Sequence, residues 1–169
     1  QILNVLSPNT QSDKFFYYSN GAWAAVANTE PMNPAGKGFI IRVPKPNIHY
    51  PNTEYWTGLT YVQKVTFEGV PNNGEIKIDT QGKSKYNLIG NPYPSAIDAD
   101  LFIKDNLNMV GGALYFWTHN TAITNNAYTS NDYAVYNLTG GTGVAAQTGG
   151  PEPNGKIASG VAFFVRSTN

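Results

Sequence analysis

The stretch NLIGNPYPSAIDADLFI, residues 87–103, joins a short apolar run to two closely spaced prolines. Proline has no backbone N–H to donate to a sheet ladder and holds the residue before it in an extended conformation. Pro92 and Pro94 therefore end the strand near Gly90. The stretch predicts a corner in a β-protein, and the question is whether it is also a binding loop or a metal site.

A helix-start signal follows the two prolines. Ser95 is a good N-cap, and Asp98, three residues later, gives the pattern of a capping box. Apolar residues then recur at helical spacing: Ile97, Leu101 and Phe102 or Ile103. We expect one short amphipathic helix over about residues 95–105, with Leu101 on its buried face and the helix closing one end of the fold.

The aspartates of this stretch also have the chemistry of calcium ligands. Asp98, Asp100 and Asp105 offer hard oxygen donors, which suit Ca²⁺. However, residues two apart on a helix do not share a face, and the chain has no Asp-x-Asp-x-Asp-Gly loop. Helix capping and solvation are the favoured interpretation, with no cofactor required and a calcium site as the alternative.

Short apolar runs separated by turn signals continue along the rest of the chain. Each is rich in Val, Ile, Tyr or Phe and is bounded by Gly, Pro, Asn or Ser. The predicted strands are residues 14–18, 22–27, 37–43, 59–70, 75–80, 85–90, 112–118, 132–137 and 160–166. About nine or ten strands at this spacing predict an all-β fold of the β-sandwich or jelly-roll type.

Length and composition agree with this class and exclude two kinds of partner. A chain of 169 residues suits a single domain, residues 1–169. Charged residues make up 13%, and the eleven basic and eleven acidic side chains cancel, so no field is available to hold nucleic acid. No apolar run approaches the length of a membrane span, so we expect no membrane insertion.

The start of the chain indicates a processed or excised piece of a longer chain. It begins QILNVLSPNT, with no initiator Met and without the basic-then-apolar order of a signal peptide. The chain has no cysteine, which excludes disulfides, thiolate chemistry and cysteine-based zinc sites.

An internal echo links the two ends of the sequence. Gly36, Phe39 and Arg42 match Gly160, Phe163 and Arg166 at one offset, and Tyr18 matches Tyr136. The echo predicts two similar strand pairs, each with a Tyr-bearing strand and a glycine-led apolar strand, that could lie side by side in one sheet. The alternative is a chance recurrence, since glycine followed by apolar residues is common in β-proteins.

Several motifs together carry a resemblance to known proteins. NLIGNPYPSAIDADLFI, YFWTHNT, NDYAVYN and GKIASGVAFFV resemble a segment of large secreted and surface proteins of the Bacteroidota. In those proteins the segment lies ahead of the C-terminal sorting domain of the type IX secretion system. The resemblance covers residue 36 to the end of the chain. It implies an extracellular or outer-surface accessory domain without catalytic activity, next to other domains of its parent protein.

Catalytic motifs are scarce in this sequence. Neither His49 nor His119 has the Ser or acidic context of a nucleophile motif, and the chain contains no G-x-S-x-G, no H-E-x-x-H and no phosphate-binding glycine loop. We therefore expect no enzyme activity. A pair of carboxylates from distant segments, such as Glu54 and Glu68, is the glycosidase alternative that sequence leaves open.

Two loops rich in aromatic residues are the candidate ligand-binding sites. Aromatic rings stack on sugar faces, and neighbouring amides hydrogen-bond hydroxyl groups. The first and preferred loop contributes His49, Tyr50, Tyr55 and Trp56, and the second choice contributes Trp117, His119 and Asn120. In both cases the alternative is that the aromatic rings fold over the sheet as core. An adhesion or recognition module that binds polysaccharide is the first function predicted, and a spacer before the sorting signal is the second.

Overall fold

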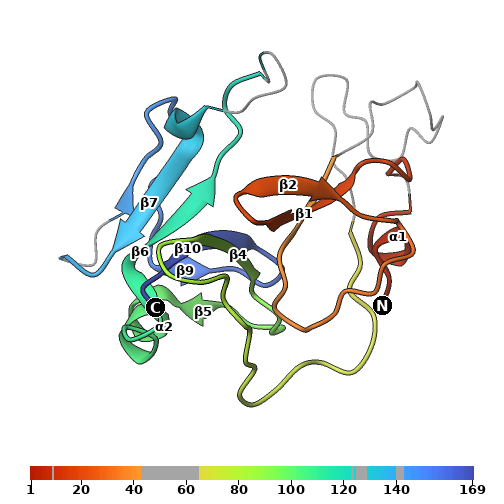
Figure 1. The fold of residues 1–169 in the computed structure, drawn as a ribbon, viewed down its shortest axis with the longest axis horizontal. Helices are drawn as coiled ribbons and strands as arrows, with labels where there is room; N and C mark the ends of the chain where they lie inside the picture. Colours follow the sequence, from red (N-terminus) through yellow and green to blue (C-terminus); the bar gives the residue numbers. More distant parts are fainter. Residues whose placement is uncertain (9, 43–64, 123, 125–128, 140–142) are drawn as a thin grey trace.

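The computed structural model describes residues 1–8, 10–42, 65–122, 124, 129–139 and 143–169 (Figure 1). These residues confirm the predicted all-β class. The strands are β1 (Phe15–Ser19), β2 (Ala22–Ala25), β3 (Phe39–Ile41), β4 (Tyr86–Gly90), β5 (Ile97–Asp98), β6 (Val110–Trp117), β7 (Tyr133–Asn137), β8 (Gly143–Val144), β9 (Lys156–Ile157) and β10 (Ala162–Ser167). The helices are α1 (Leu3–Leu6), α2 (Ala99–Asp105) and the 3₁₀ helix η2 (Ser130–Asp132).

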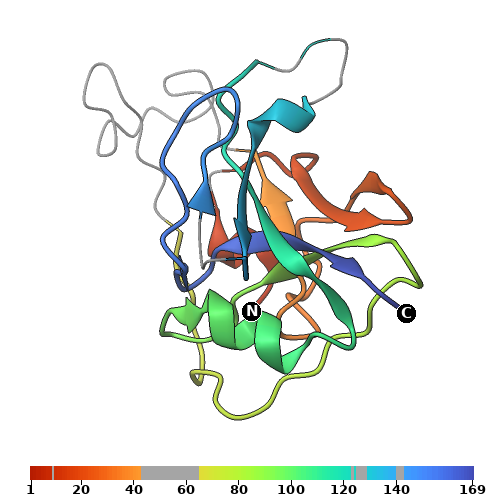
Figure 2. The ribbon, with the colours of Figure 1, turned by 90° about the vertical axis from the view of Figure 1, so that its left-hand side faces the viewer.

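The strands of the described residues form three antiparallel sheets. The largest has the order β4-β10-β6-β7-β8, the second has the order β2-β1-β3, and β5 pairs with β9 in the third. The three-stranded sheet and α2 lie on different sides of β10 (Figures 1 and 2). The five-stranded sheet is therefore covered on both faces, on one by another sheet and on the other by a helix.

Strand β10 shows how its sequence produces this layering. Successive side chains of a strand point to opposite faces, so Phe163 and Phe164 belong to different layers. Phe163 packs edge-on against Phe102 of α2, with ring centroids 5.3 Å apart. Phe164 packs edge-on against Tyr18 of β1 and Trp23 of β2, at 4.9 and 5.8 Å.

The main hydrophobic core lies between the five-stranded sheet and α2. The buried side chains of this core come from the helix and from the strands: Ile89, Ala99, Ile103, Val110, Leu114, Tyr136, Ile157, Phe163 and Val165. The alternation of Leu114 with Tyr115, and of Phe163 with Phe164, puts every second residue of the central strands into this core. Burial of such side chains is the main favourable contribution to folding.

A segment ahead of β3 joins the two large sheets along the edge of β4. The Gly90 N–H donates to the Gly36 carbonyl at 2.8 Å, and the Gly38 N–H donates to the Leu88 carbonyl at 3.2 Å. The chain then continues into β3, which pairs with β1. The approach is so close that a Cβ at Gly38 would lie 2.5 Å from Leu88 Cγ. Glycine at position 38 is therefore a packing requirement.

The corner after β4 is organised by a buried asparagine as well as by the two prolines. The Asn91 side-chain amide donates to the Ser95 carbonyl and to the Ile157 carbonyl, each at 2.9 Å. Its Oδ1 accepts a hydrogen bond from the Tyr93 N–H at 3.0 Å. These bonds satisfy backbone groups that cannot join a ladder at a proline corner. The corner was predicted, but the role of Asn91 was not.

The predicted start of the helix was wrong by four residues. Residues 97 and 98 pair with β9, so the helix begins at Ala99 and its N-cap is Asp98, whose Oδ1 accepts from the Leu101 N–H at 3.0 Å. Ser95 is exposed and caps no helix turn. The apolar face was also misjudged at Leu101, which is 59% exposed, whereas Ile103 is fully buried.

Two substitutions of Asp98 should separate the effect of its hydrogen-bond acceptor from the effect of its charge. Asparagine also caps helices well, so Asp98→Asn keeps the acceptor and removes the charge, whereas Asp98→Ala removes both. We expect wild type to have the highest melting temperature, Asp98→Asn a lower one and Asp98→Ala the lowest. Ser95→Ala should change the free energy of unfolding by no more than about 0.5 kcal/mol. A greater loss of stability for Ser95→Ala than for Asp98→Ala would contradict this assignment of the cap.

Two of the predicted strands do not form among the described residues. Residues 65–70 and 75–80 are in no strand, and residues 59–64 lie outside the described part of the chain. The alternation at 75–80 is real, because Ile76, Ile78 and Thr80 are half-buried whereas residues 75, 77 and 79 are exposed. Alternation reports burial of one side of an extended segment, and here the segment lies on the fold without a ladder partner.

The internal echo corresponds to two glycines of similar backbone conformation, but the two pairs of strands lie in different sheets. Gly36 and Gly160 both have positive φ, +88° and +71°, and both precede an apolar strand. In the first half, β3 pairs directly with the Tyr18 strand β1. In the second half, β6 lies between β10 and the Tyr136 strand β7. The expectation of two strand pairs side by side in one sheet was therefore wrong.

Candidate functional site

One of the two predicted binding loops lies within the described residues. It forms a surface at the end of β6 with Trp117, His119 and Asn120, here called the β6-end surface. Trp117 is the last residue of β6 and is half-buried, while His119 and Asn120 are exposed. The imidazole of His119 stacks on the indole, with ring centroids 4.7 Å apart and an angle of 28° between the planes. The structure thus brings the three predicted residues together, with His119 as the exposed ring.

The backbone around His119 is held in an unusual conformation. His119 has φ of +49°, a left-handed value that is uncommon for any residue other than glycine. The side-chain amide of Asn120 donates to the Gly149 carbonyl and to Thr118 Oγ1. The first of these bonds ties the β6-end surface to a loop about thirty residues away in sequence, at Gly149 and Gly150, whose φ values are also positive.

A buried aspartate beneath this surface fixes both segments. Asp132 is fully buried, and its Oδ2 accepts a hydrogen bond from Thr121 Oγ1 at 2.5 Å. Its Oδ1 accepts from Thr148 Oγ1 at 2.6 Å, and its backbone carbonyl accepts from the Thr118 N–H at 2.8 Å. A buried carboxylate requires such donors. Asp132 therefore sets the position of the residues on either side of His119.

The environment of Asp132 also sets its protonation. Burial alone raises the pKa of a carboxyl group, but the hydrogen bonds from Thr121 and Thr148 outweigh burial, so the pKa of Asp132 lies below its ordinary value. The carboxyl group is therefore ionised at neutral pH. Its charge strengthens the hydrogen bonds that hold the site.

A pH dependence follows from this lowered pKa. A group with a lower pKa in the folded state stabilises the fold above its unfolded pKa and loses that contribution as the pH falls through the folded pKa. We expect Asp132→Asn to melt below wild type at neutral pH, and the difference to shrink once the pH falls below about 4. The measurement is a series of thermal melts of both proteins across the acid range. A difference that does not change with pH would contradict the ionised hydrogen-bond network.

The first aromatic loop cannot be placed in the same way. His49, Tyr50, Tyr55 and Trp56 all lie outside the described residues. They stay predicted binding residues.

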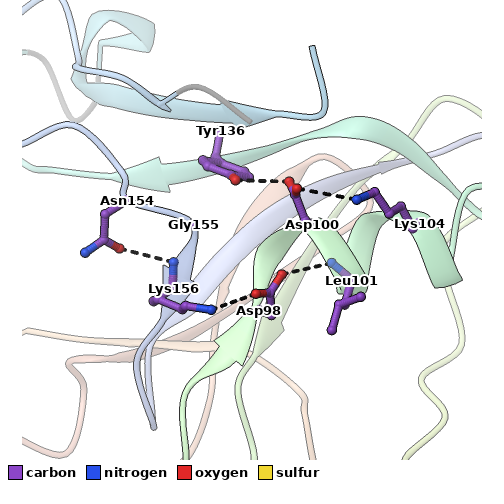
Figure 3. Close-up of a pocket in the computed structure, with 8 residues that line it drawn as sticks. All are labelled: Asp98, Asp100, Leu101, Lys104, Tyr136, Asn154, Gly155 and Lys156. Atoms are coloured by element: carbon purple, nitrogen blue, oxygen red, sulfur yellow. Dashed lines mark hydrogen bonds and ion pairs between the residues drawn. The ribbon is translucent and has the colours of Figure 1, made fainter. Parts of the chain in front are cut away.

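A second site, which the sequence only partly predicted, is an open surface pocket of about 340 Å³ beside the start of α2 (Figure 3). Asp98 binds Lys156, with Nζ 2.6 Å from Oδ2, and Asp100 accepts a hydrogen bond from the Tyr136 hydroxyl at 3.0 Å. Lys104 lies 3.5 Å from the other oxygen of Asp100. Figure 3 shows Asp98 directed towards Lys156, and Asp100 lying between Tyr136 and Lys104 of its own helix.

The arrangement of these carboxylates bears on the calcium alternative. Asp98 and Asp100 already contact lysine ammonium groups, and Asp105 lies exposed at the far end of α2. Among the described residues, no group of three or more His, Asp or Glu side chains is placed to hold a metal ion. Asp98 therefore caps the helix, Asp98 and Asp100 pair with lysines, and a calcium site stays the less favoured proposal.

Two titratable groups of this pocket have pKa values shifted away from neutral pH. The hydrogen bond from Lys156, with that from the Leu101 N–H, lowers the pKa of Asp98. Burial, with the hydrogen bond to Asp100, raises the pKa of Tyr136. Efficient proton transfer requires a pKa near the working pH, and both groups are shifted away from it.

Sequence reasoning missed several residues of both sites. Tyr136 and Lys156 face Asp100 and Asp98 from β7 and β9, strands distant from α2 in sequence. Thr121, Asp132 and Thr148 are likewise far apart in sequence. Only the Asp132 position carried a local signal, a polar Asn-Asp pair directly before an apolar strand.

Comparison with known proteins gives one match. A family model matches residues 1–169, and the family is described as a domain of unknown function (DUF8693). No curated protein and no solved structure matches the chain. None of the helices in the described part of the chain has the length and apolar character needed to cross a membrane. The function of this chain has to be inferred from its own residues.

Proposed function

The chain belongs to the family described as a domain of unknown function (DUF8693), and we propose that it is a non-catalytic recognition module. In this proposal it works outside the cell, beside other domains of a secreted parent protein. It binds neutral polysaccharide weakly through the β6-end surface. The observation that carries the proposal is the stacking of His119 on Trp117, next to a segment that the hydrogen bonds of Asp132 and Asn120 hold in place.

The stack has the properties that sugar binding requires. Rings that are fixed before binding lose little conformational freedom when a ligand arrives. His119 is fixed by the contact with Trp117 at 4.7 Å, and the neighbouring segment is fixed by Asp132 and Asn120. Because the imidazole lies against the indole, a sugar would meet the exposed imidazole and the edge of the indole.

The charge of the chain favours a neutral ligand. Eleven basic and eleven acidic residues leave a formal net charge of zero. The polar side chains exposed at the β6-end surface are the amide of Asn120 and the imidazole of His119, which suit the hydroxyl groups of a sugar. We therefore expect binding to change little between low and high salt, unlike the binding of sulfated chains to a basic patch.

The expected affinity is modest. A shallow surface with one or two aromatic rings contributes few kilocalories of useful contact, so dissociation constants should fall between about micromolar and millimolar. Attachment through several copies, or together with neighbouring domains, would raise the effective affinity without new contacts.

A matched pair of histidine variants tests this proposal. The chain has two histidines, so His119→Asn and His49→Asn make the same chemical change in the two candidate loops. Asparagine tolerates the left-handed conformation at position 119, which keeps the fold intact. Retention of each protein is measured by affinity electrophoresis in gels that contain neutral polysaccharides, with thermal melts in parallel. We expect His119→Asn to lose retention and His49→Asn to keep it.

The other outcomes point elsewhere. Loss of retention in His49→Asn alone would move the site to the first aromatic loop, around Trp56. Retention that survives His119→Asn would contradict binding through the β6-end surface. No retention of the wild type on any polysaccharide would favour the second proposed function, a spacer between domains and a sorting signal.

One observation favours the spacer as the second candidate. The two ends of the chain lie well apart, on different sides of the fold (Figures 1 and 2). A module with separated ends can stand in line between neighbouring domains. Most of the described aromatic residues are also at least half-buried, as a structural domain requires.

A further inference from the structure

The chain contains three Asn-Gly pairs, Asn20-Gly21, Asn73-Gly74 and Asn154-Gly155. This dipeptide is chemically labile because the glycine backbone nitrogen can attack the side-chain amide carbon of asparagine, and glycine has no side chain to hinder the approach. Whether it attacks in a folded protein depends on how the backbone and the side chain are held. The three pairs differ in this respect.

At Asn73 the side-chain amide is already hydrogen-bonded to the Gly74 backbone nitrogen. The Gly74 N–H donates to Asn73 Oδ1 at 2.8 Å, which brings the nitrogen close to Cγ of the same side chain. Residues 71–74 are all exposed and belong to no strand or helix, so no ladder bonds oppose a change of backbone angle at this pair. Water and base can also reach it.

The other two pairs are held in less reactive arrangements. Asn20 and Gly21 form the turn of the β1–β2 hairpin, between the paired residues Ser19 and Ala22. The Asn20 N–H is in addition bound by Gln81 Oε1 at 2.6 Å. At the third pair, Asn154 Oδ1 accepts from the Lys156 N–H at 3.1 Å, so its side chain is turned towards the residue beyond Gly155.

We propose that Asn73 is a site of spontaneous deamidation in the folded protein. The bond between the Gly74 nitrogen and Asn73 Cγ forms, the bond from Cγ to Nδ2 breaks, and Nδ2 leaves as ammonia with the proton from the Gly74 N–H. Water then opens the resulting succinimide at one of its two carbonyl carbons. Opening at the backbone carbonyl carbon gives isoaspartate, and opening at Cγ, the side-chain carbon, gives aspartate.

The product changes both charge and backbone at this loop. The formal net charge falls from zero to minus one. Isoaspartate also adds a methylene group to the main chain directly before Gly74, whose carbonyl accepts from the Tyr93 hydroxyl at 2.7 Å. Asn72 Nδ2 donates to the Pro92 carbonyl at 2.8 Å in the same place. The modification therefore loosens the contact between this loop and the proline corner.

Peptide mapping by mass spectrometry tests the proposal on the intact folded chain. After incubation in mildly alkaline buffer, the peptide with Asn73 should gain aspartate and isoaspartate several-fold faster than the peptides with Asn20 and Asn154. The same chain in denaturant is the control, because all three pairs then lose their local geometry and should react at similar rates. Isoelectric focusing should show one more acidic band as Asn73 is consumed.

Two results would overturn the proposal. One is an Asn73 peptide that stays unmodified in the folded protein while Asn20 or Asn154 converts. The other is a ranking of the three sites that is the same in folded and unfolded chains, since sequence and not geometry would then set the rates.

Discussion

Phe163→Ala will lower the free energy of unfolding by about 3–5 kcal/mol, because it removes a fully buried ring and leaves a cavity. Phe163 is 1% exposed and lies at the centre of the main core. Its ring contacts Phe102 of α2 edge-on and lies 5.9 Å from Phe116 of β6. The substitution therefore weakens the packing of the helix on the sheet as well as the packing of β10 itself.

Phe67→Ala is the matched control for this prediction. Phe67 loses the same atoms but is 56% exposed, so it should cost less than about 1 kcal/mol. Urea unfolding of the three proteins measures both values. Equal losses for the two variants would show that Phe163 does not hold the core as described.

Gly38→Ala will cost about 1–3 kcal/mol through overpacking. A Cβ at this position would lie 2.5 Å from Leu88 Cγ and 3.0 Å from the Leu88 carbonyl carbon and oxygen. The backbone cannot move aside without stretching the hydrogen bond from the Gly38 N–H to the Leu88 carbonyl. That bond is one of those that join the three-stranded sheet to β4, so the two sheets should separate more easily.

Gly112→Ala isolates the effect of this close approach. Like Gly38, Gly112 has no positive φ, and a Cβ added at Gly112 would have no neighbouring atom within 4 Å. Alanine restricts the unfolded chain more than glycine does, so Gly112→Ala should be neutral or slightly stabilising. The two variants are compared by denaturant unfolding. A Gly38→Ala protein as stable as Gly112→Ala would contradict the junction between the sheets.

Local patterns in the sequence predicted those parts of the fold whose cause is local. Pro92 and Pro94 remove ladder donors wherever they stand, so the end of β4 could be predicted from the chain alone. The strands around Leu114 and Phe163 were predicted from their short apolar runs between turn residues, which are also local. The corner and the short helix after it were correct in kind.

Features that depend on distant partners were missed or misplaced. The helix starts at Ala99 and not at Ser95 because Ile97 pairs with Ile157, about sixty residues away. Leu101 has the right spacing for a buried face but lies on the solvent side, since the side of α2 that meets the sheet is set by tertiary packing. Residues 75–80 alternate like a strand without having a partner.

The same difference between local and distant causes applies to the candidate site. YFWTHNT was recognised as an aromatic cluster because its residues are adjacent in sequence, and the structure places Trp117 and His119 in contact. Asp132 and Thr148 support that cluster from segments that no local pattern connects with it. The support comes from the pairing of β6 with β7, which carries η2 and its aspartate to the end of β6.

The most direct test of the proposed binding surface is a titration observed by histidine imidazole NMR. The chain has two histidines, so the spectrum contains one imidazole signal from the β6-end surface and one from the first aromatic loop, assigned with His119→Asn and His49→Asn. Addition of a neutral polysaccharide should shift the His119 signals progressively, to the same extent at low and high salt, and leave those of His49 unchanged. His119 signals that do not move with any polysaccharide, while the wild-type protein is retained by one, would contradict binding at the β6-end surface.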